Sequence, residues 1–133
     1  MAKKITTEQE ALKKVQQDGE ALNIVPDNLK TAEVCLAAVE QYGGALKFVP
    51  DNLKTPELCL IAVQEDNGSR NASLLYVPEN LKTPELFLAA VKVHGYALQF
   101  VPESSITVEL CRVAVKEDDR ALKYVPENFR DKL

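Results

Sequence analysis

The residues of this chain best suited to nucleophilic or metal chemistry are three cysteines and one histidine. A cysteine activated by a histidine can act as a nucleophile, and cysteines at Cys-x-x-Cys spacing can hold zinc. The chain has no Cys-x-x-Cys, and its cysteines share one position of an internal repeat at which Phe87 also occurs. This predicts buried core residues, because free cysteine behaves as a small apolar side chain. The cysteines are Cys35, Cys59 and Cys111.

The only histidine, His94, stands next to Gly95 near a predicted helix end. An imidazole there can face the negative end of the helix dipole, and no partner for a Cys–His dyad or a metal site falls in register with it. The chain also lacks a phosphate-binding loop and a cluster of metal ligands. We therefore expect no enzymatic activity, no catalytic residue, no metal site and no cofactor.

Carboxylates recur in two rows along one edge of the repeat, with basic residues between them, and together they account for the acidic net charge of −4. One interpretation is structural, because carboxylates stabilise helix N-termini and pair with lysines. The other is that the edge attracts a basic partner, which makes Asp51, Glu79 and Glu103 candidate interaction residues. The first acidic row is Asp27, Asp51, Glu79, Glu103 and Glu127, the second is Glu33, Glu57, Glu85 and Glu109, and the bases are Lys30, Lys54, Lys82 and Arg130.

Aromatic residues also repeat, at a position that Ile24 fills in the first copy. We expect this aromatic row to form a ladder inside the core. Such a row could instead stack nucleic-acid bases, but a net charge of −4 lacks the basic footprint that nucleic-acid binding requires. The sequence therefore predicts no nucleic-acid partner. The aromatic row is Phe48, Tyr76, Phe100 and Tyr124.

One copy carries extra length at a joint between units, within Asn67 to Ala72. Insertions in repeat arrays map to one face, which is often the binding face. Exposed loops also accept added length at little cost, without any function. Under the first interpretation the candidate interaction residues are Asn67, Gly68, Ser69, Arg70 and Asn71.

These residues are all positioned by one repeat, which is marked by the dipeptide Val-Pro. It ends at Pro26, Pro50, Pro78, Pro102 and Pro126, at intervals of 24, 28, 24 and 24 residues. A period of this size predicts small units that must stack to bury their apolar faces. We expect a single repeat domain over residues 1–133, with a capping half-repeat at 1–20, full repeats at 21–44, 45–72, 73–96 and 97–120, and a partial repeat at 121–133.

Each unit carries signals for one long helix. A threonine precedes it as a helix N-cap, and in two copies a proline follows at the first helical position. Glycine near the other end predicts a left-handed residue that stops a helix of about 11 or 12 residues. The segment before Val-Pro has room for one turn of α or 3₁₀ helix, and Asp-Asn then makes a turn. The threonines are Thr7, Thr31, Thr55, Thr83 and Thr107, and the glycines are Gly19, Gly43 and Gly95.

The two ends of the array depart from the repeat. Glu10 and Lys14 replace apolar residues of the other copies, which is typical of a polar capping unit. At the carboxyl end no further long helix follows the one that carries Leu110, Val113 and Val115. We expect this end to be incompletely covered and to mediate self-association or to contact a continuation of the array.

The pattern A-L-x-x-V-P-E-N-L-K-T-P-E-L-C-L-A-A-V resembles the bacterial and viral repeat family known as domain of unknown function 4116, over about Thr7 to Arg130. The copy from Ala97 to Arg120 departs most from this pattern, because Glu103 to Thr107 replaces the Glu-Asn-Leu-Lys-Thr turn and Arg112 replaces leucine. In length and in its turn the unit is also similar to leucine-rich variant repeats, a resemblance that implies alternating α and 3₁₀ helices. Neither resemblance implies an enzymatic activity.

The sequence thus predicts an all-α fold, an α-solenoid of about five 24-residue repeats that each hold one α-helix and a short α or 3₁₀ turn. We expect a non-catalytic interaction or scaffold module for a protein or peptide, because stacked repeats create extended surfaces. The alternative is a regulatory or substrate-recruiting segment of a larger protein. The sequence shows no signal peptide and no membrane-spanning segment, which predicts a cytoplasmic protein without a membrane partner.

Overall fold

The computed structural model describes residues 5–65 and 72–133, and within these residues every regular element is a helix. The chain is an all-α repeat solenoid. It divides into two compact units, Met1–Leu81 and Lys82–Leu133. The single domain over residues 1–133 stays a prediction.

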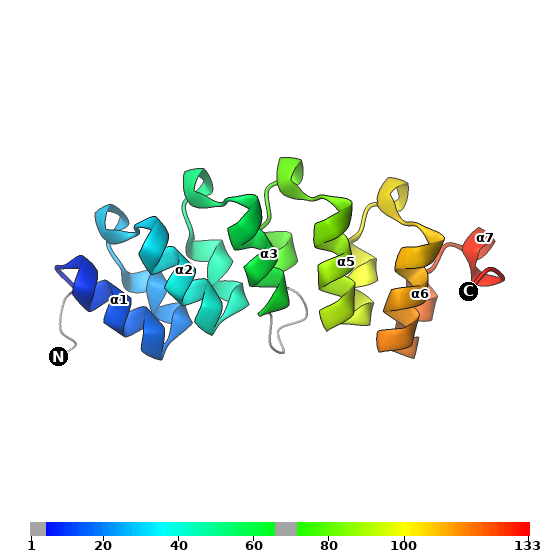
Figure 1. The fold of residues 1–133 in the computed structure, drawn as a ribbon, viewed down its shortest axis with the longest axis horizontal. Coiled ribbons are helices and arrows are strands. Elements are labelled where there is room, and N and C mark those ends of the chain that lie inside the picture. The colour runs from blue at the N-terminus through cyan, green and yellow to red at the C-terminus, as the bar shows by residue number, and fades with distance from the viewer. Residues whose placement is uncertain (1–4, 66–71) are drawn as a thin grey trace. The chain divides into compact units, whose positions relative to one another are not determined.

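Most repeats consist of a long α-helix, a six-residue 3₁₀ helix and a three-residue 3₁₀ turn, which confirms the predicted order of elements. Figure 1 shows the long helices, each of which after the first follows a short three-residue turn. The long helices have nine or ten residues rather than the predicted 11 or 12. They are α1 (Glu8–Gln17), α2 (Ala32–Gln41), α3 (Pro56–Gln64), α5 (Pro84–Val93) and α6 (Val108–Glu117).

The short elements recur between the long helices. Two α-helical turns, α4 and α7, occupy positions that 3₁₀ helices occupy in other copies. The departure of Glu103–Ser105 from the family pattern leaves its 3₁₀ turn intact. The longer 3₁₀ helices are η1 (Gly19–Ile24), η3 (Gly43–Phe48), η6 (Gly95–Phe100) and η8 (Asp119–Tyr124), the turns are η2 (Asp27–Leu29), η4 (Asp51–Leu53), η5 (Glu79–Leu81) and η7 (Glu103–Ser105), and the α-helical turns are α4 (Ala72–Leu75) and α7 (Glu127–Arg130).

Packing within each unit is in two layers. In the first unit α1 packs against α2, α2 against α3, and η1 against η3. In the second unit α5 packs against α6, and η6 against η8. The leucine of the A-L-x-x-V-P pattern is fully buried in four copies, and the alanines of the long helices at positions such as Ala38 and Ala62 are buried as well. The fully buried leucines are Leu22, Leu46, Leu74 and Leu98.

The threonine caps are confirmed in every long helix. At Thr55 the side-chain oxygen accepts a hydrogen bond of 3.1 Å from the backbone N–H of Leu58. Pro56 and Pro84 occupy the first helical position, where their missing N–H costs nothing. The same capping bond is made at Thr7, Thr31, Thr83 and Thr107.

Thr55→Ala is expected to lower the free energy of unfolding by about 1 kcal/mol, because the first turn of α3 loses its capping acceptor. Thr55→Ser keeps the hydroxyl and should retain most of the stability. Urea unfolding followed by circular dichroism measures both changes. Equal losses in the two variants would show that the methyl group, and not the cap, matters at this position.

The prediction that glycines end the long helices in a left-handed conformation is wrong. The long helices end one residue earlier, at residues such as Asp18 and His94 with extended backbone (φ −153° and −140°), and neither Gly19 nor Gly95 has a positive φ. Glycine is needed for space instead. A Cβ on Gly19 would lie 2.6 Å from the carbonyl oxygen of Ala38 in the next long helix.

Candidate functional site

The cysteines are core residues, as predicted from their repeat position. Cys35, Cys59 and Cys111 are fully buried free thiols, and burial raises the pKa of each. The ring of His94 packs against that of Tyr96, with 5.3 Å between ring centroids. In residues 5–65 and 72–133, no group of three or more histidine, cysteine, aspartate or glutamate side chains is placed to hold a metal ion.

Burial of the thiols predicts a specific pH dependence. The folded chain keeps its thiol protons to higher pH than the unfolded chain, so stability should fall as the pH rises through the ordinary thiol pKa of about 8.5. Modification by a thiol reagent at pH 8 should be at least about a hundredfold slower in the native protein than in urea, because the thiolates form only after opening. Rapid labelling of the native protein would contradict this.

The expected aromatic ladder inside the core is wrong. Tyr76 is 38% exposed, Ile24 is exposed, and the other members of the row are half-buried. The reason is the geometry of the 3₁₀ helix, in which each residue turns by about 120°. The leucine two positions earlier fills the core, so the aromatic side chain points to another face. The sequence pattern alone did not distinguish these two faces.

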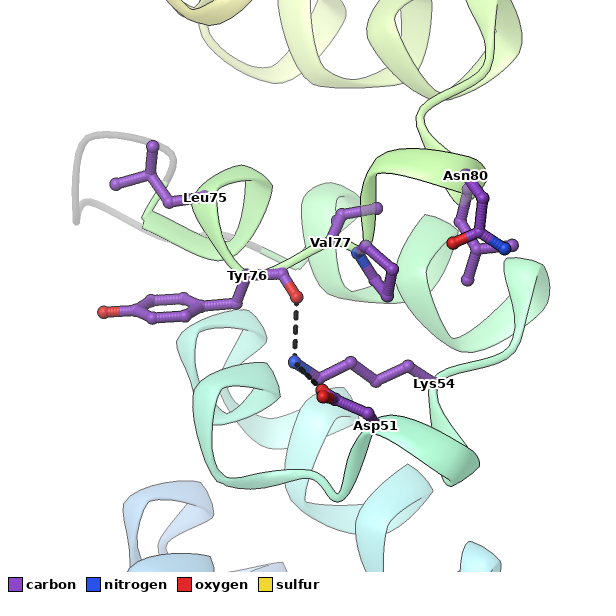
Figure 2. A pocket seen from close by; sticks show the side chains of 8 residues that line it. Asp51, Lys54, Leu75, Tyr76, Val77 and Asn80 are labelled. Atoms are coloured by element: carbon purple, nitrogen blue, oxygen red, sulfur yellow. Dashed lines mark hydrogen bonds and ion pairs between the residues drawn. The ribbon is translucent and has the colours of Figure 1, made fainter.

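Two members of the predicted charged edge, Asp51 and Lys54, meet the aromatic row at the junction between repeats. The ammonium of Lys54 lies 3.2 Å from a carboxylate oxygen of Asp51 and donates a hydrogen bond of 2.9 Å to the main-chain carbonyl of Tyr76. Figure 2 shows this lysine between the two acceptors, with the Tyr76 ring pointing away from the ammonium. The Lys54 side chain is only 8% exposed, whereas that of Asp51 is 91% exposed. The lysine therefore links two repeats, and its role was not predicted.

These residues line a concave pocket of about 500 Å³, called here the Tyr76 pocket. Its walls combine a carboxylate, a buried ammonium, the Tyr76 residue, the Val-Pro dipeptide and an asparagine. The exposed side chain of Leu75 stands at its edge (Figure 2). The lining residues are Asp51, Lys54, Leu75, Tyr76, Val77, Pro78, Asn80 and Leu81.

A second pocket, of about 440 Å³, repeats this arrangement one junction earlier and is called here the Phe48 pocket. Lys30 lies 3.4 Å from a carboxylate oxygen of Asp27, and the lysine side chain is again buried (12% exposed) while the aspartate is 96% exposed. Every lining residue has its equivalent in the Tyr76 pocket. They are Asp27, Lys30, Phe48, Val49, Pro50, Asn52 and Leu53.

The structure brings together only some of the predicted interaction residues. Asp51 lines the Tyr76 pocket, and Glu79 is an exposed residue at the start of the next turn. Glu103 is exposed at the start of η7 in the second unit. Asn67, Gly68, Ser69, Arg70 and Asn71 lie outside the described residues.

The second unit corrects part of the prediction about the carboxyl end. Leu110 is buried, while Val113 and Val115 are half-buried. Leu122 is 44% exposed although the equivalent leucines are fully buried, and Leu133 is also exposed. The guanidinium of Arg112 donates a 2.7 Å hydrogen bond to the carbonyl of Lys132. Self-association through this end stays a prediction.

The fold defines an all-α repeat protein, and one pocket recurs at two successive junctions of its first compact unit. The chain belongs to the repeat family described as Domain of unknown function (DUF4116), which matches residues 9–54, 31–69 and 55–105. No curated protein and no solved structure shows significant similarity to the chain. Among the described residues, no helix has the length and apolar character to cross a membrane.

Proposed function

We propose that this chain is a non-catalytic interaction module that binds a protein segment or peptide. The observation that carries the proposal is the recurrence of one pocket at two successive junctions of the first unit, with an aromatic residue at one position and identical residues at the other six shared positions. A row of equivalent pockets suits a partner that is itself extended and repetitive along its length.

The composition of the pockets supports binding rather than catalysis. The buried ammonium of Lys54 is held by a carboxylate and a carbonyl of its own chain, which leaves it a structural role. The half-exposed rings and the Val-Pro dipeptides supply apolar surface, and the carboxylates and asparagines supply polar contacts. Such mixed surfaces are typical of peptide recognition sites. In a longer polypeptide, the same surface would serve to recruit a substrate for an enzymatic part.

The test is selection from a displayed random-peptide library on the immobilised full chain. A Phe48→Ala/Tyr76→Ala double variant, immobilised in the same way, serves as the control. Both side chains lie outside the buried core, so we expect the variant to fold. We expect enriched peptides that bind the wild-type chain at least about tenfold more tightly than the double variant. No enrichment, or equal binding to both surfaces, would overturn the proposal.

A further inference from the structure

The ion pairs of the two pockets are oriented, with the base inside and the acid outside. The side chains of Lys30 and Lys54 are largely buried, and their partners Asp27 and Asp51 are almost fully exposed. An approaching partner therefore meets carboxylate oxygens, which accept hydrogen bonds but donate none. Charge complementarity at this surface favours a partner with cationic donors.

The rings at the aromatic position already attract cations within the chain. The ammonium of Lys47 lies 4.9 Å from the centre of the Phe48 ring, and that of Lys123 lies 5.2 Å from the centre of the Tyr124 ring. At the Tyr76 pocket the position of Lys47 is taken by Leu75, which is apolar and exposed. The chain thus places no lysine beside Tyr76 at the position that supplies the cation in those two copies.

From these charges and rings, and building on the function proposed above, we infer that the two pockets hold basic side chains of one extended peptide, with arginine preferred. A guanidinium can stack on an aromatic ring and bind a carboxylate at the same time, which an ammonium does less well. Asp51 and Tyr76 form the stronger pocket, and Asp27 with Phe48 forms the second.

The repeat geometry sets the spacing of those side chains. Packed helices such as α2 and α3 lie about 8–10 Å apart, so equivalent points of successive repeats are separated by about the same distance. A peptide in the extended polyproline II conformation advances about 3.1 Å per residue and completes one turn every three residues, so side chains three positions apart point to the same face and lie about 9 Å apart. The basic residues of the ligand are therefore three positions apart, as in Arg-x-x-Arg.

The inference is tested by fluorescence anisotropy with labelled peptides and the full chain. The peptides carry two arginines at spacings of two, three or five positions in a Gly-Ser background, with a Glu-x-x-Glu peptide and an apolar Leu-x-x-Leu peptide of equal length. We expect the Arg-x-x-Arg peptide to bind at least about fivefold more tightly than the other arginine spacings. Its affinity should fall as salt rises from about 50 to 500 mM, because the attraction is electrostatic.

Three variants locate the contact. Asp51→Asn should weaken binding of Arg-x-x-Arg by about fivefold or more, and Glu40→Gln, which removes an exposed carboxylate away from both pockets, should leave it unchanged. Leu75→Lys places an ammonium beside Tyr76, as Lys47 lies beside Phe48, and should compete with the peptide and weaken binding about threefold or more. Because the chain already accepts lysine at that position in another copy, this variant keeps the test valid if Asp51→Asn unfolds.

The outcomes separate this inference from the proposed function. Tight binding of the glutamate or leucine peptide that depends on Tyr76, without binding of Arg-x-x-Arg, would overturn the basic ligand and leave the interaction module standing. Arginine peptides that bind without regard to spacing, or equally to wild type and Leu75→Lys, would also overturn the inference. If neither these peptides nor library peptides bind, both proposals fail.

Discussion

Gly95→Ala is expected to lower the free energy of unfolding by about 1–3 kcal/mol, because the added methyl group overpacks the contact between two repeats. A Cβ at this position would run into the carbonyl oxygen of Ala114 and would lie 3.0 Å from the backbone nitrogen of Asp118. Both are main-chain atoms, and they cannot move without displacing α6. Urea unfolding followed by far-ultraviolet circular dichroism measures the change.

Gly44→Ala provides the matched control. A Cβ there would meet the end of the Tyr42 ring, a half-buried side chain that can rotate away. The loss should be less than about 0.5 kcal/mol, since alanine also suits a helical segment better than glycine. If both variants lost equal stability, backbone conformation rather than the close approach of two repeats would explain the glycine at position 95.

Lys54→Met is the second large effect, with an expected loss of about 2 kcal/mol. The variant removes the hydrogen bond between the Lys54 ammonium and the Tyr76 carbonyl, which joins one repeat to the next, together with the ion pair to Asp51. Methionine retains most of the apolar stem, so the loss reports the charged group rather than the packing. Thermal and urea unfolding of the full chain give the change in free energy.

Lys13→Met is the control for Lys54→Met, because Lys13 is exposed on the long helix α1 and carries the same charge. Its effect should stay within about 0.5 kcal/mol. Similar losses in the two variants would mean that the ammonium of Lys54 contributes no more than a surface lysine does.

The local structure of this chain could be predicted in some detail from its sequence. Thr55 followed by Pro56 marks a helix start because a hydroxyl cap and a fixed φ act within one turn, independently of the rest of the fold. The Val-Pro period likewise predicted stacked units, and the shared position of the cysteines predicted their burial. All of these signals depend on neighbours in the chain or on the repeat register.

The candidate site could be predicted only in part. Asp51 was identified from the charged edge, but its neighbour Lys54 was expected to be an ordinary ion-pair partner. Its hydrogen bond to the carbonyl of Tyr76 joins residues 22 positions apart. Because every residue has a main-chain carbonyl, the sequence does not indicate which carbonyl a lysine will bind. The sequence-based prediction placed the aromatic row in the core. A row of apolar residues shows that one face of its element is buried, but it does not show how the 3₁₀ helix is rotated about its axis.

Residue types and their spacing were enough to predict the all-α repeat architecture, the helix starts and the burial of the cysteines, because periodicity, capping and apolar character are local or periodic signals. The contacts between the repeats became visible only in the folded chain. The fold placed Gly95 against a carbonyl rather than in a left-handed turn, turned the aromatic row outward, and combined an exposed aspartate, a buried lysine and a ring into one pocket. These outcomes depend on the distance and rotation between stacked elements. Both are set by the packing of the whole unit and not by any short segment of the sequence.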